Sequence, residues 1–403
     1  MFAKSFYSRQ AKNSGAKYFL GNFAPMKKAY LDNASTTAMR PEVISEITHV
    51  LATVYGNPSS THSFGRTAKV VLETARKNIA SLVNAEAREI IFTSGGTEAN
   101  NLILHSAVKD LGIRRIISSR TEHHSVLNTI PELVTQFGIR ADYVNLIPGG
   151  SPDLKHLEAL LQEDIPTLVS LIHVNNETGT VLNLHKTGTL CRQYKALFHT
   201  DTVQSVGKTE FNLRELPVDF MVSSAHKYHG PKGIGFAYIN KKIGLKPMIY
   251  GGEQEKGLRG GTEAVHQVAG MAKALELSYA NLTTDRQHIT NVKNYLHEQL
   301  NIHFPGFKIN GESDKEELLY NITNVLLPLP DDKTAMILFH LDMQGVAVSR
   351  GSACQSGSVK PSHVLKEILS DEDVKKPSLR ISFSHYNTND DVDLLIEALK
   401  KMG

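Results

Sequence analysis

Short apolar runs alternate with longer amphipathic patterns through the middle of the chain. From Ser81 to about Gly235, turn residues bound each run and a helical pattern follows it. This arrangement generates βαβ units and a mostly parallel sheet. The runs predict seven strands, at Glu89–Thr93, Arg115–Ser118, Ala141–Leu146, Leu168–Val174, Ala196–Thr200, Asp219–Ser223 and Gly235–Ile239. We therefore expect one large α/β domain around a central sheet.

Two long amphipathic patterns, Glu263–Ala280 and Thr284–His303, follow the predicted sheet. Mixed strand and helix patterns come after them, at Tyr320–Leu327, Thr334–Met343, Val346–Ser349, Pro361–Ile368, Leu379–Phe383 and Asp390–Lys401. They span too few residues for another doubly wound sheet, so they predict a smaller α+β domain, hinged near residues 260–285. We divide the chain into four segments: an N-terminal extension (1–25), a segment joining the small domain (26–45), the large domain (46–279) and the small domain (280–403).

The composition is ordinary for a soluble globular chain of enzyme size. The chain has 403 residues, of which 41% are hydrophobic and 21% charged, so it is too long for one small module and too apolar for disorder. No apolar run approaches the roughly 18 residues of a membrane helix. The formal charge of +3 gives no support to nucleic acid as a partner, because six basic residues precede the first acid, Asp32.

The first 25 residues are basic, contain several serines and lack acids, which is typical of an organellar transit peptide. Gly15, Gly21 and Pro25 would interrupt an amphipathic helix, and Met26 follows, so an over-long start or a disordered tail is the favoured interpretation. The two cysteines, Cys191 and Cys354, cannot form a disulfide framework and suit a reducing compartment. We expect a cytoplasmic protein, or a mitochondrial one if the extension is a transit peptide.

Polar residues follow the predicted strands at the edge where open α/β sheets bind ligands. After the first strand, a Gly95-Gly96-Thr97 turn leads into a helical pattern, whose N-terminus could bind a phosphate. The same turn is also an ordinary helix cap. Asn175, Asn176 and Glu177 follow the fourth strand, and Asp201 and Gln204 follow the fifth. Taken alone, such residues are most often turn formers.

Lys227 lies just after the sixth strand, among histidine, serine and glycine neighbours. A solvated surface lysine is the default interpretation. With Asp201 at the preceding strand end and a phosphate-type turn upstream, the set instead describes a pyridoxal phosphate site. The lysine would form the Schiff base, the aspartate would hold the pyridinium proton, and the helix end would bind the phosphate.

The motifs as a set resemble the cysteine desulfurases, which belong to the class V aminotransferases among fold-type I pyridoxal phosphate enzymes. The resemblance runs from about Lys28 to the C-terminus. It rests on Asp32-Asn33-Ala34-Ser35-Thr36-Thr37, Gly56-Asn57-Pro58-Ser59-Ser60, Thr93-Ser94-Gly95-Gly96-Thr97-Glu98-Ala99-Asn100-Asn101, Thr121-Glu122-His123, His173-Val174-Asn175-Asn176-Glu177, Asp201-Thr202-Val203-Gln204-Ser205-Val206-Gly207-Lys208 and Ser224-Ala225-His226-Lys227.

The resemblance implies a role for each matched position of the cofactor site. Lys227 would be the Schiff-base lysine, Asp201 the partner of the pyridine nitrogen, and Gln204 a donor to the ring hydroxyl oxygen. Thr262 matches a phosphate ligand that the family supplies from a second subunit, which implies a homodimer with shared sites. The residues implied at the phosphate within one chain are Gly96, Thr97, Ser224 and His226.

The resemblance also implies the groups that handle the substrate. His123 matches an imidazole that stacks on the cofactor ring and transfers protons, a role suited to a group titrating near neutrality. A buried, satisfied histidine is the alternative interpretation. Asn176, beside the cofactor, and Arg380 match the groups that hold the substrate carboxylate, for which a guanidinium is well shaped.

The fold alone leaves the reaction open, because it also hosts transaminases, lyases and racemases. Cys354 is the residue that indicates which reaction this chain catalyses. It lies in a Gly/Ser-rich segment, about residues 349–360, whose composition predicts a mobile loop. A thiol there could attack the sulfur of a bound cysteine, which leaves a persulfide on Cys354 and releases alanine. A free cysteine with no role is the alternative. Cys191, in a helical pattern, is interpreted as a packing residue.

Two positions depart from the family pattern: Arg350 stands where a serine is expected, and Ser384-His385 replaces the usual glycine and arginine. Neither removes a matched catalytic residue. The sequence therefore indicates a pyridoxal phosphate cysteine desulfurase of the long-loop group, a sulfurtransferase. It would convert L-cysteine to L-alanine and supply sulfur for iron–sulfur cluster, thio-cofactor or tRNA biosynthesis.

Two other functions remain open at this point. One is a selenocysteine lyase, and the other is a non-catalytic scaffold for sulfur-transfer proteins. We expect L-cysteine and a sulfur-acceptor protein as partners, and neither nucleic acid nor membrane. No resident metal is expected, although Cys354 could transiently ligate an iron–sulfur cluster.

Overall fold

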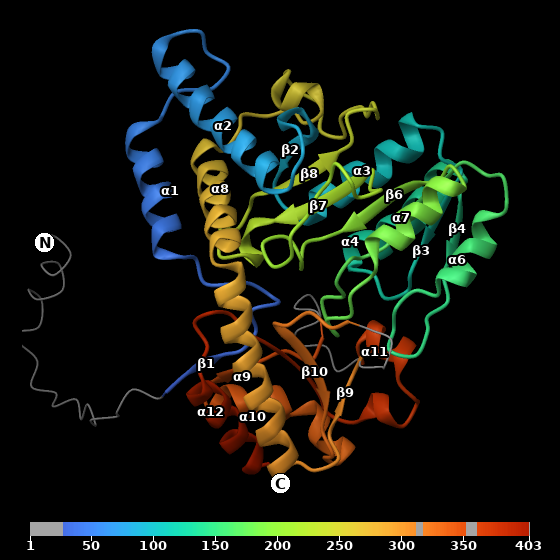
Figure 1. Cartoon of the computed structure of the whole chain (residues 1–403), viewed down its shortest axis with the longest axis vertical. Coiled ribbons are helices and arrows are strands. Elements are labelled where there is room, and N and C mark those ends of the chain that lie inside the picture. The colour runs from blue at the N-terminus through green and yellow to red at the C-terminus, as the bar shows by residue number, and fades with distance from the viewer. Residues whose placement is uncertain (1–26, 312–316, 352–360, 403) are drawn as a thin grey trace, which may run out of the picture.

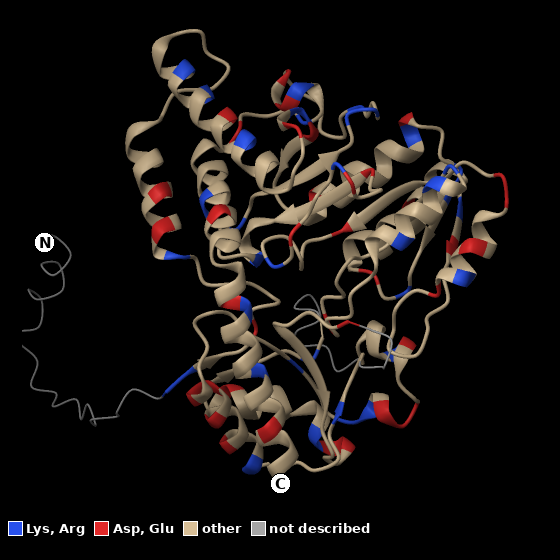
Figure 2. Ribbon diagram, viewed as in Figure 1, with Lys and Arg blue, Asp and Glu red and all other residues tan. Residues whose placement is uncertain are grey.

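The protein is described by a computed structural model that covers residues 27–311, 317–351 and 361–402. Two units lie one above the other in Figure 1, and each has its own apolar core. The N-terminal extension and Cys354 lie outside the described residues. Basic and acidic residues are interspersed over both units (Figure 2).

Seven strands of the described chain form the sheet of the upper unit, in the order β2-β8-β7-β6-β5-β3-β4. Neighbours from β7 to β4 run parallel, whereas β8 is antiparallel to both β7 and β2. The predicted seven-stranded, mostly parallel sheet is therefore confirmed. Its strands are β2 (Ile90–Thr93), β3 (Arg115–Ser118), β4 (Arg140–Tyr143), β5 (Thr167–Ser170), β6 (Leu197–Asp201), β7 (Phe220–Ser224) and β8 (Gly235–Ile239).

Apolar side chains point to both faces of this sheet. In β7, Met221 belongs to the core on one face, whereas Phe220 and Val222 belong to the core on the other. Helices cover both cores, so the strands are continuous apolar runs instead of alternating patterns (Figure 1). The helices of this unit are α1 (Pro41–Thr53), α2 (Ser63–Leu82), α3 (Gly96–Asp110), α4 (His124–Leu127), α5 (Thr129–Phe137), α6 (Leu154–Leu161), α7 (Leu184–Gln193) and α8 (Val265–Ala280).

The lower unit holds a three-stranded antiparallel sheet in the order β12-β10-β9, and β1 pairs in parallel with β11. These strands are β1 (Ala29–Tyr30), β9 (Lys308–Ile309), β10 (Ile322–Leu326), β11 (Val346–Ala347) and β12 (Ser378–Ser382). The helices are α9 (Leu282–His303), α10 (Ile337–Met343), α11 (His363–Ile368) and α12 (Asn389–Lys400). The chain passes from the upper core to the lower one where α8 gives way to α9 (Figure 1).

Several elements are shorter than the patterns that predicted them. The run Ala141–Leu146 forms a strand only as far as Tyr143, because its partner β3 ends at Ser118. The run Val346–Ser349 forms only the two-residue β11, since its partner β1 has two residues. A hydrophobic pattern records burial, whereas the length of a strand depends on its neighbour. No helix of the described residues is both long and apolar enough to cross a membrane.

Candidate active site

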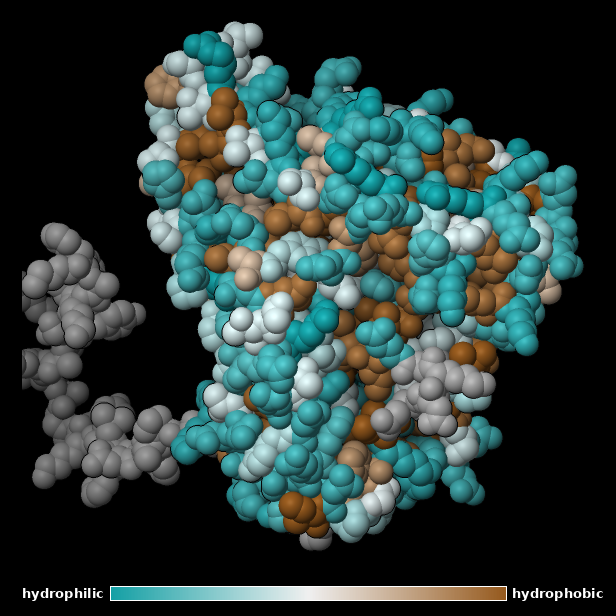
Figure 3. All heavy atoms as spheres, viewed as in Figure 1, coloured by the Kyte–Doolittle hydropathy of each residue, from teal (hydrophilic) through white to brown (hydrophobic). Residues whose placement is uncertain are grey.

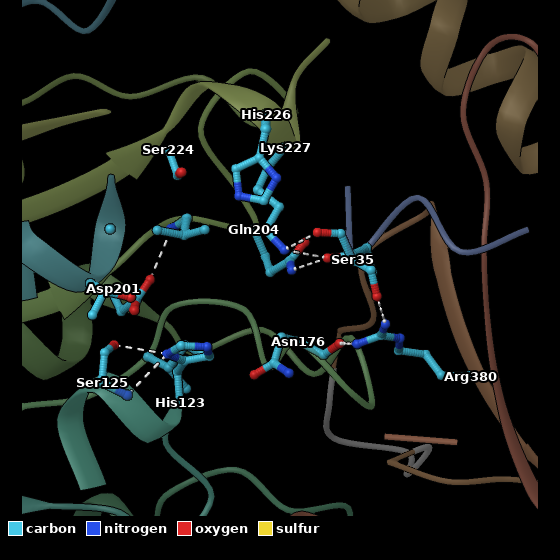
Figure 4. Close-up of a pocket in the computed structure, with 15 residues that line it drawn as sticks. Ser35, His123, Ser125, Asn176, Asp201, Gln204, Ser224, His226, Lys227 and Arg380 are labelled. Atoms are coloured by element: carbon cyan, nitrogen blue, oxygen red, sulfur yellow. Dashed lines mark hydrogen bonds between the residues drawn. The ribbon is translucent and has the colours of Figure 1, made fainter. Parts of the chain in front are cut away.

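A pocket of about 320 Å³ lies where the carboxyl ends of the upper strands meet the lower unit (Figure 4). Most of its lining follows β2, β3, β6 and β7, while Arg380 enters from β12. The lining residues are Ala34, Ser35, Gly96, Thr97, His123, Ser125, Ile172, Asn176, Asp201, Val203, Gln204, Ser224, His226, Lys227 and Arg380. The topological rule for open α/β sheets thus locates the pocket.

One end of the pocket is formed by the start of α3. Gly95, the N-cap, has φ 151°, which residues with a side chain rarely adopt, and no side chain caps the helix. A Cβ on Gly96 would lie 2.6 Å from Cγ2 of Val203, so only glycine allows this close approach. The first N–H groups of α3, with Thr97 and Ser224 beside them, form a site suited to an anion.

Lys227 reaches the pocket from the short 3-10 helix that follows β7. Its Nζ donates to the carbonyl oxygens of Ala34, at 2.6 Å, and Ser35, at 2.8 Å. Its neighbour His226 is held to Thr36 Oγ1 at 3.1 Å. Burial, reinforced by the charge of Lys227, lowers the pKa of His226 to about 3. His226 is therefore a neutral hydrogen-bonding group at neutral pH.

Asp201 and His123 are joined by a chain of hydrogen bonds that runs through Asn100 and Ser125. Nδ2 of Asn100 donates to Oδ2 of Asp201 at 2.7 Å and to Oγ of Ser125 at 2.8 Å. Ser125 Oγ lies 2.8 Å from Nδ1 of His123. Because Asp201 is 4% exposed and also accepts from Val203 N at 3.0 Å, its carboxylate has a fixed orientation.

The same contacts determine the tautomer of His123. The backbone N–H of Ser125 donates to its Nδ1 at 3.1 Å, so that nitrogen accepts and the proton of the neutral ring is on Nε2. Burial lowers the pKa of His123, Asp201 raises it, and Lys227 lowers it, with a net decrease. A neutral imidazole with an Nε2 N–H donor therefore lies at the pocket.

Arg380 forms the wall contributed by the lower unit. Its Nη2 donates to Asp32 Oδ1 at 2.8 Å and Ser35 Oγ at 2.6 Å, and its Nη1 donates to Asn176 O at 2.9 Å. The residue is 1% exposed, and its Nε has no hydrogen-bond partner among the described residues. A buried guanidinium with one unsatisfied donor at a pocket is suited to an anionic ligand.

The structure brings most of the predicted site residues together. Those that line one pocket are Gly96, Thr97, His123, Asn176, Asp201, Gln204, Ser224, His226, Lys227 and Arg380. Thr262 is exposed and does not line the pocket of its own chain, and Cys354 lies outside the described residues. In the described part of the chain, no group of three or more His, Cys, Asp or Glu side chains could hold a metal ion.

Sequence reasoning missed Asn100, Ser125 and Ser35. Asn100 lies one turn beyond Gly96 in α3, and this i, i+4 spacing could have placed it on the face of Gly96. Ser125 lies two residues after His123, the N-cap of α4, and an N-cap side chain bonds the backbone N–H two or three residues on, so this spacing could have placed Ser125 beside His123. Ser35 carries no comparable signal, because its contact with Arg380 spans 345 residues.

Comparisons with known proteins agree with this architecture. The family described as Aminotransferase class-V matches residues 29–395. The chain is 36% identical over 378 residues to the cysteine desulfurase IscS of Dictyoglomus turgidum, covering 93% of this chain and 94% of that protein. It is 40% identical over 371 residues to the putative cysteine desulfurase IscS 1 of Bacillus subtilis, with coverage of 91% and 96%.

Solved structures give the same result. A NifS-like protein superposes with a TM-score of 0.85 at 33% identity, covering 93% of this chain and 99% of its own. The NifS-like protein of Rickettsia africae gives a TM-score of 0.82 at 33% identity, with the same coverage. The chain therefore belongs to the class V aminotransferases and, within them, to the cysteine desulfurase family.

Proposed function

We propose that this enzyme converts L-cysteine to L-alanine with pyridoxal phosphate as its cofactor and carries the released sulfur as a persulfide on Cys354. The observation that carries the proposal is the convergence of Lys227, Asp201 and His123 in one pocket that also contains a helix N-terminus. An amine, a buried carboxylate and an imidazole placed together serve proton transfer next to an amine-linked substrate.

The residues present fit the cofactor. The resemblance assigned Gln204 as a donor to the ring hydroxyl oxygen, but its Nε2 donates to Ala34 O at 2.9 Å. Its Oε1 is buried and has no hydrogen-bond partner among the described residues, so Gln204 would instead accept from the ring hydroxyl. Asp201 would hold a protonated ring nitrogen, Lys227 would bind the aldehyde carbon, and the start of α3 would hold the phosphate with Thr97, Ser224 and His226. When bound, pyridoxal phosphate supplies an electron sink for the substrate α-carbon.

The chain's own groups bind the substrate and move protons. Arg380, with its unsatisfied Nε, would hold the substrate carboxylate, and Asn176 lies beside it. His123 would donate a hydrogen bond from Nε2 at the reacting atoms and would transfer that proton from the protonated ring, while the Asn100–Ser125 chain orients the ring through Nδ1. Burial of the pocket strengthens each of these polar contacts.

Cys354 is proposed as the sulfur carrier, since the chain's other thiol is unsuitable. Cys191 is fully buried in the core, and burial raises the pKa of its thiol to about 12, so it remains protonated. Attack of the Cys354 thiolate forms an S–S bond as the substrate C–S bond breaks. L-cysteine plus a thiol then give L-alanine plus a persulfide. A structural neighbour with a TM-score of 0.76 and 30% identity is titled SspA in complex with cysteine.

We extend the proposal to the protein's partners and location. The enzyme is proposed to be a cytoplasmic homodimer in which Thr262 of each copy contacts the phosphate in the other pocket. The persulfide would pass to a sulfur-acceptor protein, either an iron–sulfur scaffold or a sulfur carrier. The exposed position of Thr262, outside the pocket of its own chain, supports the homodimer with shared phosphate sites. Relatives named IscS support the transfer of sulfur to an acceptor protein.

The test is incubation of purified protein with L-cysteine, with and without reductant. We expect alanine and reductant-released sulfide in equal amounts. Mass spectrometry should show a reductant-sensitive gain of one sulfur atom on the Cys354 peptide only. Cys354→Ala should bind pyridoxal phosphate and lose this activity, whereas the matched control Cys191→Ala should retain it.

Each remaining result has a distinct meaning. Undiminished cysteine desulfuration by Cys354→Ala would exclude the persulfide route. Activity of that variant on selenocysteine alone would identify a lyase. A wild-type protein that binds pyridoxal phosphate but releases no alanine would be a scaffold.

A further inference from the structure

Residues 249–262, which we call the strap, contain a strained left-handed turn. Glu255 has φ 45°, Lys256 has φ 59°, and Gly257 follows with φ 77°. Two successive residues with side chains in this region are unfavourable, and such conformations persist where surrounding contacts hold them, often at functional sites. The structure therefore maintains the strap in a defined shape through specific contacts.

The first of these contacts is a buried ion pair with α2. Arg76 donates to both carboxylate oxygens of Glu255, at 2.7 and 2.8 Å, and each side chain is only 2% exposed. Oε2 of Glu255 also accepts from Phe92 N at 2.7 Å, and Arg76 Nη1 donates to Ile90 O at 2.8 Å. The pair thus attaches the strap to β2, the edge strand of the sheet, and satisfies its free backbone groups.

The second contact attaches the strap to the pocket's own helix. Arg259 Nε donates to Glu98 Oε1 at 2.9 Å, and the other carboxylate oxygen accepts from Ser94 N at 2.8 Å. Glu98 lies in the first turn of α3, two residues after Gly96 of the pocket. The start of α3 and the end of the strap are therefore held together.

Beyond these two contacts, the strap ends in Gly260-Gly261-Thr262, of which Gly261 and Thr262 are exposed. Thr262 faces solvent and does not line its own pocket. The helix that supplies Arg76 also exposes apolar side chains: Phe64 is 54% and Val70 64% exposed, and Phe64 packs on Tyr55. Figure 3 shows apolar residues exposed over α1 and α2 at the upper left of this face. Apolar exposure of this kind marks a protein contact.

We infer that Glu255 and Arg259 are positioning residues that act across a homodimer. They hold the strap of one copy in the shape that presents Thr262 to the pocket of the second copy. The inference rests on the proposed function for the identity of the ligand, pyridoxal phosphate. It adds that two ion pairs within each chain, Arg76–Glu255 and Glu98–Arg259, hold the strap in the shape that the cross-subunit contact of Thr262 requires. Through Glu98, each strap is also attached to α3, the helix that begins at the pocket of its own chain.

The experiment uses two kinds of mixed dimer, purified with different tags on the two chains. In the first, a Glu255→Gln chain pairs with a Lys227→Ala chain. In the second, a wild-type chain pairs with a chain carrying both substitutions. Pyridoxal phosphate is titrated, borohydride fixes it, and mass spectrometry counts labelled Lys227. Only one pocket in each dimer can be labelled.

We expect the Glu255→Gln homodimer to need roughly tenfold more pyridoxal phosphate for half-labelling than wild type. The first mixed dimer should behave as wild type, because the Lys227 pocket receives an intact strap. The second should behave as the Glu255→Gln homodimer. Glu253→Gln, which removes an exposed charge from the same strap, is the matched control and should match wild type.

Three results would overturn the inference. If only the first mixed dimer binds pyridoxal phosphate more weakly, the effect of Glu255 lies within one chain, and if both mixed dimers bind it equally weakly, the substitution destabilises the protein in general. The third result is a wild-type protein that is monomeric. If Glu255→Gln does not fold, Arg259→Gln replaces it in the same two dimers, since its side chain is 25% exposed. A wild-type chain in which Lys227 is never labelled would contradict the proposed function itself, a separate outcome.

Discussion

At the scale of single residues, the oriented carboxylate of Asp201 dominates the site. Its Oδ2 accepts from Asn100 Nδ2 and its Oδ1 accepts from Val203 N. Both side-chain oxygens must therefore be acceptors, as they are in a carboxylate. We predict that Asp201→Asn folds but loses several powers of ten in turnover, because a neutral amide cannot hold a protonated ring nitrogen. Each ~1.4 kcal/mol lost is tenfold in rate.

Turnover of Asp201→Asn should be measured beside circular dichroism and thermal melting. The matched variant is Asn100→Asp, which places a second carboxylate against Asp201 and should also lower activity. If Asp201→Asn keeps wild-type turnover, Asp201 has only a structural role in the turn after β6.

His123 allows a prediction that separates kcat from KM. Its contacts place the proton on Nε2, and the substrate carboxylate is proposed to bind Arg380, a separate group of the pocket. His123→Gln should therefore lower kcat about 10²- to 10⁴-fold with little change in KM. Because burial lowers the pKa of His123, the wild-type acid limb assigned to it should lie below pH 6.5 and be missing in the variant. A change confined to KM would assign His123 to substrate binding alone.

At the scale of elements, Gly188 shows how a helix is fitted to its neighbour. It lies inside α7, where alanine would normally stabilise by about 1 kcal/mol. A Cβ at this position would lie 2.2 Å from the backbone oxygen of Pro217, which cannot move as a side chain could. We predict that Gly188→Ala destabilises the protein by about 1–3 kcal/mol, measured by urea unfolding.

The control for that substitution is Gly244→Ala, where an added Cβ meets nothing within 4 Å. It should change the free energy of unfolding by no more than about 0.5 kcal/mol. Stabilisation by Gly188→Ala would show that helix propensity outweighs the contact with Pro217.

At the scale of the whole molecule, buried histidines make stability dependent on pH. His173 and His199 are 7% and 0% exposed, and burial lowers the pKa of each to about 4. Because the unfolded chain has a pKa near 6.5, it binds more protons than the folded chain between pH 6.5 and 4. Stability therefore falls as the pH falls through this window.

The expected loss is about 1.4 kcal/mol per histidine for each pH unit below 6.5, or about 2 kcal/mol each at pH 5. Urea midpoints at pH 7 and pH 5 measure it. His199→Gln should reduce the loss of unfolding free energy between pH 7 and pH 5 by the contribution of one histidine, about 2 kcal/mol. Equal midpoints for the wild type at the two pH values would contradict the lowered pKa values of these buried imidazoles.

Much of the fold follows from the chain because burial leaves a local record. The seven apolar runs predicted seven strands, since a strand covered on both faces must be apolar at successive positions, as Phe220, Met221 and Val222 are. Site residues such as Gly96, Asp201 and Lys227 were found because parallel strands end at one edge, so residues after different strands meet there. His123 and Arg380 were implied only by the family resemblance.

The sequence by itself thus determined the elements, the fold class and the residues at the strand ends, which depend on contacts within a few positions. Only the tertiary structure decided that β8 runs antiparallel between β2 and β7, that Asn100 links Asp201 to Ser125, and that Arg380 reaches Asp32. The last contact spans 348 residues. Such pairings depend on how whole elements are placed against one another, and no local periodicity encodes that placement.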